Sequence, residues 1–182
     1  MFSSASSEWE TPWDFFDKLD RIFHFTLDPC ATPENTKVPL HYFTKEDDGL
    51  TKGWDGEVVF MNPPYGRQIG KWIEKAYKEG EKIDTIVVCL IPARTDTSWW
   101  HNYCTRAREI WFLRGRIKFI NRTFPSYRED GDFKLSSAPF PSAIVIFGKD
   151  LYSKHSVYEM HYGFLWNNRH LEPRPQTLYV NF

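Results

Sequence analysis

The sequence has little cysteine, no long apolar run and almost no net charge, and each absence excludes a class of protein. Its 182 residues include three cysteines, Cys30, Cys89 and Cys104, and no CxxC pair, so neither a disulfide framework nor a zinc site is indicated. The six histidines have no ligand-like spacing, and we expect no metal cofactor. The longest apolar stretch, Thr85 to Pro92, is far shorter than the roughly 20 residues that span a bilayer, so we expect no membrane segment.

The start of the chain and its composition indicate a cytoplasmic globular protein. The first ten residues, MFSSASSEWE, have no basic start and no apolar run, which argues against a secretion signal or transit peptide. With 41% hydrophobic and 26% charged residues, the chain has the composition of a packed core under a charged surface. Its length is that of one ordinary domain.

The net charge of −1 conceals an uneven distribution along the chain. Residues 1–60 hold 12 acidic and 5 basic side chains, whereas residues 101–128 hold seven basic side chains against Glu109 alone. The basic stretch is a candidate surface for nucleic-acid phosphates. The alternative is a solvated basic face whose charge is balanced by the acidic N-terminal part.

Aromatic residues are abundant: 15 Phe, 9 Tyr and 8 Trp. Such a supply suits stacking on nucleobases, although most of the rings must form the core. We expect four of the tryptophans to be core or surface anchors rather than ligand contacts: Trp54, Trp72, Trp99 and Trp100.

Hydrophobic periodicity predicts alternating strands and helices. Helices are expected over 14–25, 68–79 and 97–106, and strands over 23–27, 57–61, 85–91, 110–113, 117–120 and 142–147, with a short extended piece at 41–43 and a loop over 121–141. This order predicts an α/β fold with a mostly parallel sheet and helices on both faces. Only 34 residues separate Asp28 from Asn62, so the sheet should be trimmed around its second and third strands.

Two loops with unusual sequences follow predicted strands, one at Asp28-Pro29 and one at Asn62-Pro63-Pro64-Tyr65-Gly66. In α/β sheets, ligands bind beyond the carboxyl ends of the strands, so both loops should face one crevice. The prolines donate no hydrogen bonds, and the second loop offers the Asn62 side-chain oxygen and the Pro63 carbonyl as acceptors. Two acceptors can hold a planar amino group and direct its lone pair toward an electrophile carried by a cofactor.

This loop is typical of amino-methyltransferases, with Tyr65 supplying a ring face for a planar base. The structural alternative is a strand-ending proline turn with an asparagine and a tyrosine of purely structural use. The match to a strand followed by a helix favours the catalytic interpretation.

Several further strings extend the likeness from about Glu10 to Phe147. They are Thr11-Pro12, LDPCAT (27–32), YFT (42–44), DGL (48–50), VFMNPPYG (59–66), IPARTDTSWW (91–100), RGRIKF (114–119) and APFPSA (138–143). In these strings the chain resembles the phage-type DNA N6-adenine methyltransferase (Dam-like) family. The resemblance implies a single-domain, Rossmann-like methyltransferase fold, S-adenosylmethionine as the cofactor, and adenine in double-stranded DNA as the acceptor, in a bacterial or phage-infected cell.

Site residues follow from the same resemblance. The catalytic loop would comprise Asn62, Pro63, Pro64 and Tyr65, and cofactor contacts would come from Thr11, Pro12, Asp28, Cys30, Ala31, Asp48, Gly49, Leu50 and Asn62. Unlike the usual methyltransferase loop, the segment DPCATPENT contains no glycine.

Extrusion of a target base requires phosphate contacts on both sides of the site. One candidate, Arg94, lies at the end of the central strand. The others lie within a predicted DNA-binding segment at 106–141: Arg114, Arg116, Lys118, Arg122 and Arg128. Residues 1–150 would form the methyltransferase domain, with a cofactor half at about 10–56, and residues 151–182 would form an extension packed on it. No sequence feature indicates more than a monomer or a weak dimer.

Two rival functions stay open at this point. One is a methyltransferase acting on RNA adenine or on protein glutamine, which a similar loop also serves. The other is a catalytically silent nucleic-acid-binding relative. The basic cluster at 106–128 argues against a protein substrate, and the intact Asn62–Tyr65 loop argues against loss of activity.

Overall fold

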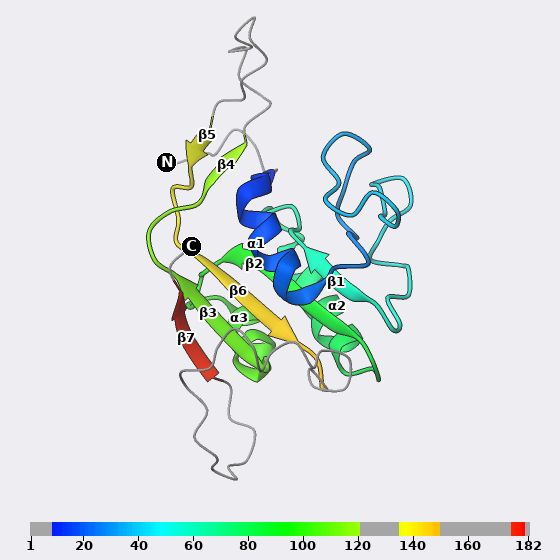
Figure 1. Ribbon diagram of the computed structural model, residues 1–182. Coiled ribbons are helices and arrows are strands. Elements are labelled where there is room, and N and C mark those ends of the chain that lie inside the picture. Colours follow the sequence, from blue (N-terminus) through cyan, green and yellow to red (C-terminus); the bar gives the residue numbers. More distant parts are fainter. Residues whose placement is uncertain (1–8, 121–134, 150–175, 181–182) are drawn as a thin grey trace, which may run out of the picture.

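A computed structural model describes residues 9–120, 135–149 and 176–180 of the protein (Figure 1). The described elements, in chain order, are α1 (Trp13–Phe23), β1 (Val58–Met61), α2 (Ile69–Gly80), β2 (Ile86–Pro92), α3 (Ser98–Asn102), the 3₁₀ helix η1 (Cys104–Arg106), β3 (Glu109–Leu113), β4 (Lys118–Ile120), β5 (Leu135–Ser137), β6 (Ser142–Phe147) and β7 (Gln176–Val180). Helices and strands alternate through α3, as the hydrophobic pattern predicts.

A five-stranded sheet with the order β1-β2-β6-β3-β7 forms the centre of the molecule. The pairs β1–β2 and β3–β7 are parallel, whereas β6 is antiparallel to both of its neighbours, β2 and β3. The sheet is therefore mixed, and the prediction of a mostly parallel sheet was wrong. The described part of the connection from β3 to β6 consists of the antiparallel strands β4 and β5 and contains no helix. For β6 to run parallel to β3, the chain would have to cross back to the opposite end of the sheet, and such crossovers are usually helical. Because the connection returns at the same end, β6 runs antiparallel to β3.

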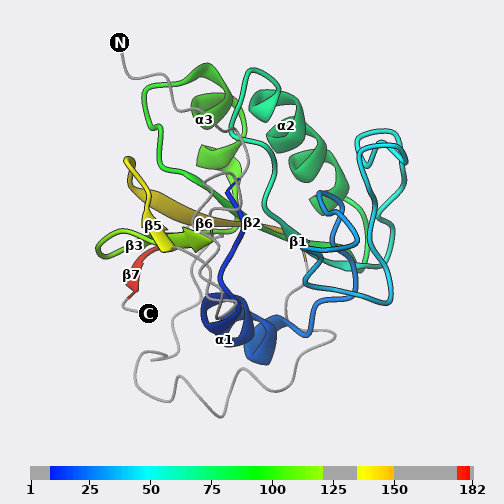
Figure 2. The same cartoon turned by 90° about the horizontal axis from the view of Figure 1, so that it is seen from above.

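Helices cover both faces of this sheet (Figure 2). α1 lies on one face, where four of its side chains are buried: Phe15, Phe16, Leu19 and Phe23. α2 and α3 lie on the other face, and α2 connects β1 to β2 in a parallel strand–helix–strand unit. Every residue of β1, β2 and β6 is buried, as expected for strands covered on both sides.

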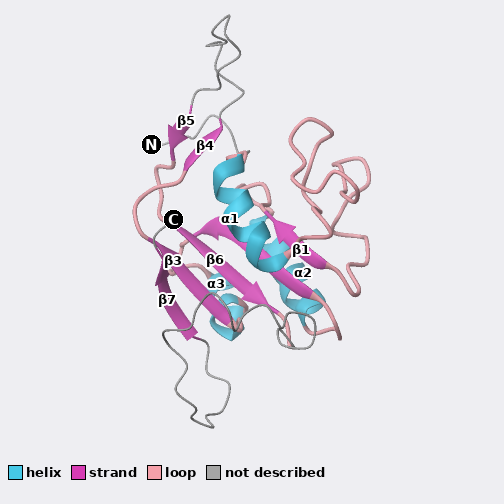
Figure 3. Cartoon of the chain, viewed as in Figure 1, coloured by secondary structure: helices cyan, strands magenta, loops and turns pink. Residues whose placement is uncertain are grey.

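Between α1 and β1 the sheet is reduced to isolated pairings, and Figure 3 shows this stretch as extended loops. His24 adopts a left-handed conformation with φ 55° and ends the helix, so the strand predicted over 23–27 is not formed as such. Only Leu27, which pairs with Val59, and Asp28, which pairs with Tyr42, make parallel bridges here. This agrees with the prediction of a sheet trimmed in this region.

Two further predictions need correction. The helix predicted over 97–106 is split into α3 and η1, because the backbone at Tyr103 leaves the helical region with φ −126° and ψ −53°. The loop predicted over 121–141 contains β5, which pairs with β4, while residues 121–134 lie outside the described residues. In the described part of the chain, no helix has both the length and the apolar character needed to cross a membrane.

Candidate active site at the carboxyl end of strand β1

The loop Asn62 to Gly66 leaves the carboxyl end of β1 and leads into α2. Pro63 and Tyr65 are buried, whereas Pro64 is exposed. This position, at the end of a buried parallel strand and before a helix, is where α/β sheets hold ligands.

The side-chain amide of Asn62 is fixed by two hydrogen bonds. Its Nδ2 donates to the backbone oxygen of Trp9 at 2.6 Å and to the hydroxyl of Thr11 at 2.9 Å. Its Oδ1 is buried and accepts no hydrogen bond from any described residue. Because a buried acceptor without a donor is costly, such an atom indicates a position where a ligand supplies the missing hydrogen.

The ring of Tyr65 is enclosed. Its hydroxyl donates to the backbone oxygen of Leu90 at 3.0 Å, and its ring meets Phe119 and Phe140 edge to face, with centroids 6.2 Å and 5.5 Å away. Burial, with a smaller effect of Cys30, raises the pKa of the phenol well above its ordinary value, so Tyr65 stays neutral. The side chain is only 7% exposed, and in this structure the ring face expected to stack on a base is covered.

Trp9 completes an aromatic cluster around this loop, defined as Trp9, Tyr65, Phe119 and Phe140. The Trp9 ring lies edge to face with Phe119 at 5.6 Å and with Phe140 at 5.3 Å. Sequence reasoning did not identify Trp9, Phe119 and Phe140 as site residues. A signal was present in the sequence, because Phe119 and Phe140 belong to the strings RGRIKF and APFPSA.

The N-terminal strip, residues 9–12, contacts the Asn62–Gly66 loop. Thr11 and Pro12 are buried, and Thr11 touches Asn62 directly. Ile120 of β4 donates its backbone N–H to the oxygen of Glu10 at 2.9 Å. The structure thus brings Thr11, a predicted cofactor contact, to the predicted catalytic asparagine.

Asp28 is a buried carboxylate, 5% exposed, at the end of the first extended segment. It accepts hydrogen bonds from the backbone N–H groups of Cys30 and Lys37, both at 3.2 Å. Burial outweighs these two bonds and the smaller effect of the Lys37 charge, and it raises the pKa of Asp28 to about 6. A carboxyl group of this kind gains most from a cationic ligand, because a cation restores the charged form that burial disfavours.

The glycine-free loop after Asp28 lies against residues 41–43. The backbone N–H of Asp28 donates to the oxygen of His41 at 3.1 Å, and that of Phe43 donates to the oxygen of Asp28 at 2.9 Å. Ala31 donates its N–H to the oxygen of Phe43, so the backbone N–H groups of both Cys30 and Ala31 already have internal partners. The main group of this loop that is left to bind a ligand is therefore the carboxylate of Asp28.

The turn Asp48-Gly49-Leu50 packs directly on this loop. Asp48 is exposed and has a left-handed backbone with φ 52°, while Gly49 is buried. A Cβ atom at Gly49 would meet the backbone oxygen of Pro29 at a distance of 2.3 Å. The indole N–H of the fully buried Trp54 donates to the oxygen of Gly49 at 3.1 Å. The two predicted cofactor segments, 28–31 and 48–50, are thus in contact.

Gly49→Ala is expected to lower the free energy of unfolding by about 2–3 kcal/mol, because the added methyl group must displace backbone at Pro29. It should also weaken cofactor binding by separating the two segments. The matched control is Gly53→Ala, whose methyl group would meet only the flexible carboxylate of Asp55. Urea denaturation of both variants checks the prediction, which is contradicted if the two lose equal stability.

A buried ion pair joins the N-terminal strip to the Asp28 loop. Lys37 Nζ lies 3.4 Å from Glu10 Oε1, and the two side chains are 2% and 9% exposed. The ammonium also lies 4.1 Å from the centroid of the Trp13 ring. Sequence reasoning missed this pair, because nothing local connects two residues 27 positions apart.

The three cysteines are free thiols. Burial raises the pKa of Cys30 and Cys89 well above the ordinary value and that of Cys104 to about 12, so all three stay protonated. Among residues 9–120, 135–149 and 176–180, no group of three or more His, Cys, Asp or Glu side chains could hold a metal ion.

The predicted DNA contacts fall into two described places. Arg114, Arg116 and Lys118 are exposed around the turn from β3 to β4, where Gly115 has φ 85° as the tight turn requires. Arg94 is exposed after β2 and lines a pocket with residues of α2 and α3. Two of the predicted contacts, Arg122 and Arg128, lie outside the described residues.

Three features are consistent with a methyltransferase. They are the mixed α/β sheet with an Asn-Pro-Pro-Tyr loop at the end of β1, the Asn62 oxygen without a hydrogen-bond donor among the described residues, and the buried carboxylate of Asp28. Comparison with known proteins is more specific. The chain matches the family model described as DNA N-6-adenine-methyltransferase (Dam) over residues 2–155, and it belongs to this family. The resemblance inferred from the sequence strings is thereby confirmed.

One relative is the DNA N-6-adenine-methyltransferase of Haemophilus phage HP1 (strain HP1c1). The two sequences are 34% identical over 116 residues, which cover 62% of this chain and 66% of the relative. The matched region therefore spans just under two thirds of the relative's length.

Proposed function

We propose that this protein transfers a methyl group from S-adenosylmethionine to the exocyclic amine of an adenine extruded from double-stranded DNA. The observation that carries the proposal is the fixed amide of Asn62, whose buried Oδ1 accepts no hydrogen bond from a described residue. Membership in the adenine-methyltransferase family supports adenine as the acceptor.

In this mechanism Asn62 Oδ1 accepts one hydrogen of the adenine amine, and the Pro63 carbonyl accepts the other. The bond to Thr11 and the bond to the Trp9 backbone keep the Asn62 amide from rotating, so its oxygen stays directed at the amine. Both acceptors favour a lone pair on nitrogen that is free to attack. When bound, S-adenosylmethionine, held by residues such as Asp28 and Thr11, would supply an electrophilic methyl group to this nitrogen, and the proton displaced from the amine would pass to water.

Tyr65 would contact the extruded base after a shift within the aromatic cluster. Its hydroxyl is held by the backbone oxygen of Leu90, and its ring is covered by Phe119 and Phe140. Displacement of either phenylalanine by a base would replace one aromatic contact with another.

The residues near the catalytic loop fit the cofactor by charge. Asp28 would pair with the ammonium of the methionine end, in the loop of Cys30 and Ala31. Thr11 and Pro12 would cover that end, and the turn Asp48-Gly49-Leu50 would contact the adenine end. The packing of Gly49 on Pro29 supports a single continuous binding site for both ends.

The remaining assignments form part of the same proposal. Residues 1–150 would be the methyltransferase domain and 151–182 an extension packed on it. The DNA backbone would be bound by Arg94, Arg114, Arg116, Lys118, Arg122 and Arg128. Cellular DNA as the substrate would mean that the reaction takes place in the cytoplasm of a bacterial or phage-infected cell.

The test is transfer of radiolabelled methyl from S-adenosylmethionine to unmethylated duplex DNA, followed by nucleoside analysis, with RNA and a protein extract as competing acceptors. We expect label in N6-methyladenine from DNA. Label confined to RNA or to protein glutamine would overturn the assigned acceptor. Cofactor binding without transfer to any of the three would indicate a catalytically silent relative.

A further inference from the structure

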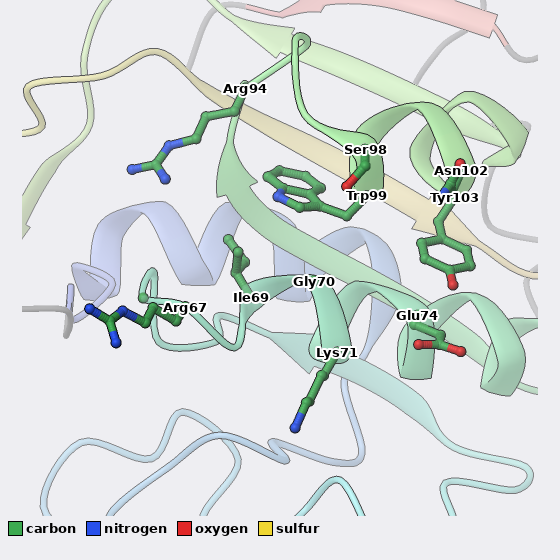
Figure 4. A pocket seen from close by; sticks show the side chains of 11 residues that line it. Arg67, Ile69, Gly70, Lys71, Glu74, Arg94, Ser98, Trp99, Asn102 and Tyr103 are labelled. Atoms are coloured by element: carbon green, nitrogen blue, oxygen red, sulfur yellow. The ribbon is translucent and has the colours of Figure 1, made fainter.

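A pocket of about 520 Å³ opens between the beginning of α2, α3 and the segment that joins β2 to α3 (Figure 4). Of the predicted site residues, it contains only Arg94. Its lining begins at Gly66, the residue that follows the catalytic Tyr65. The pocket is therefore a neighbour of the catalytic loop rather than a part of it.

Three cations border this pocket without a described partner. Arg67, Lys71 and Arg94 are exposed, and none of them forms an ion pair with a described residue. In Figure 4, Arg67 and Arg94 extend from opposite sides of the pocket toward the same open side. Glu74 also lines the pocket but pairs with Lys78 at 2.6 Å, so the three cations leave an excess of positive charge there, which favours binding of an anion.

The other lysines on and just after α2 behave differently. Lys75 lies 2.6 Å from Glu79, Lys78 lies 2.6 Å from Glu74, and Lys82 pairs with Glu79 at 2.8 Å. Positive charge is therefore neutralised along the distal part of the helix and left unpaired at its beginning, beside the catalytic loop.

An aromatic ring lies within the same pocket. Trp99 packs on Gly70, where a Cβ atom would lie 3.6 Å from the indole, and its side chain is partly exposed. The sequence predicted a core or surface anchor; the indole packs against the core and also lines the wall of the pocket (Figure 4). Unpaired cations combined with an aromatic face are typical of surfaces that bind nucleic-acid strands.

The pocket is also close to the reaction site along the chain. Arg67 follows Tyr65 by two residues, and two residues of backbone extend at most about 7 Å. The pocket therefore begins within a short distance of the loop that carries Asn62.

We propose that this pocket binds backbone phosphates of the DNA strand that carries the target adenine, through Arg67, Lys71 and Arg94, with Trp99 contacting the adjoining sugar. The proposal rests on DNA being the substrate and adds Arg67, Lys71 and Trp99 to the expected contacts. Phosphate contacts on this side, together with those at the β3–β4 turn, would hold the strand on both sides of the extruded base.

The experiment compares a double variant, Arg67→Ala with Lys71→Ala, with a matched control, Lys18→Ala with Arg21→Ala. The control removes the same charge from exposed positions of α1 on the opposite face of the sheet. Binding of a fluorescent 20-base-pair duplex is measured by anisotropy over a range of salt concentrations. The slope of log affinity against log salt changes by about 0.9 for each phosphate that the protein no longer neutralises.

We expect the pocket variant to bind DNA at least tenfold more weakly at low salt, with a slope smaller by about 1–2, while the control retains the wild-type slope. Unchanged thermal melting and S-adenosylmethionine affinity would show that both variants are folded. A pocket variant with the wild-type slope, or a control whose slope falls as far, would overturn the proposal.

Failure of this inference is distinguishable from failure of the proposed function. If the wild-type protein methylates DNA and the pocket variant binds DNA normally, the pocket assignment is wrong and the proposed function is unaffected. If the wild-type protein transfers no methyl group to DNA but the variant still shows the reduced slope, the pocket assignment stands and the enzymatic function falls.

Discussion

Asn62→Ala is expected to lower the single-turnover rate of methyl transfer to duplex DNA by about 100- to 1,000-fold, the usual cost of removing one preorganised polar group at a reacting atom. The physical reason is the loss of Oδ1, the buried acceptor that no described residue satisfies. Cofactor affinity should change little, because the carboxylate of Asp28 is unaltered. Rapid-quench measurement with labelled cofactor gives the rate, and calorimetry gives the affinity.

A second variant separates the acceptor from its support. Thr11→Val keeps Asn62 and the bond from its amide to the Trp9 oxygen but removes the bond to the Thr11 hydroxyl. We expect a smaller loss of rate, about tenfold, because one bond of about 1 kcal/mol still orients the amide. An Asn62→Ala rate within threefold of wild type, or a Thr11→Val loss as large as that of Asn62→Ala, would contradict the assigned roles.

Cofactor binding by the wild-type protein is expected to strengthen as the pH rises through about 6, the pKa of buried Asp28. Below that pH the carboxyl group is protonated and cannot pair with an ammonium group; above it, the carboxylate can form the pair. Asp28→Asn should bind the cofactor weakly and without this pH dependence. Isothermal titration between pH 5 and pH 8 is the measurement, and constant wild-type affinity over this range would refute the role of Asp28.

The same group makes a prediction of opposite sign for the protein without cofactor. Because the folded-state pKa of Asp28 lies above the ordinary value of 3.8, the folded protein binds the proton more tightly than the unfolded chain. The resulting stabilisation is fully present below about pH 4 and is lost as the pH rises through about 6. A difference of about two pKa units corresponds to about 3 kcal/mol, so wild type should lose this much stability relative to Asp28→Asn between pH 4 and pH 8.

The position of the Asn62–Gly66 loop was predictable because its signal is local. Four consecutive residues after an apolar strand determine where the strand ends, and the structure ends β1 at Met61, directly before Asn62. The amphipathic pattern of α2 and the apolar run of β2 are local in the same way, and both elements lie within one residue of their predicted bounds.

The direction of β6 and the surroundings of Tyr65 were not predictable on these grounds. An apolar run such as Ser142–Phe147 predicts a buried strand but carries no information on which way it runs; that depends on the route of the chain after β3. Likewise, the contacts of Tyr65 with Phe119 and Phe140 join segments more than 50 residues apart. The family itself was identifiable because several short strings occur in order, which requires no knowledge of these distant contacts.

The support of Asn62 by the N-terminal strip has a consequence for how the protein can be divided. The two groups that orient its amide lie 53 and 51 residues earlier in the chain, while the strand and helix that carry the loop are continuous. A fragment containing only β1, α2 and β2 would retain every residue of the Asn62–Tyr65 motif and yet leave the asparagine amide free to rotate. Recombination that exchanged the Asn62–Gly66 loop without residues 9–12 would therefore transfer the residues of the motif but not the contacts that orient the Asn62 amide.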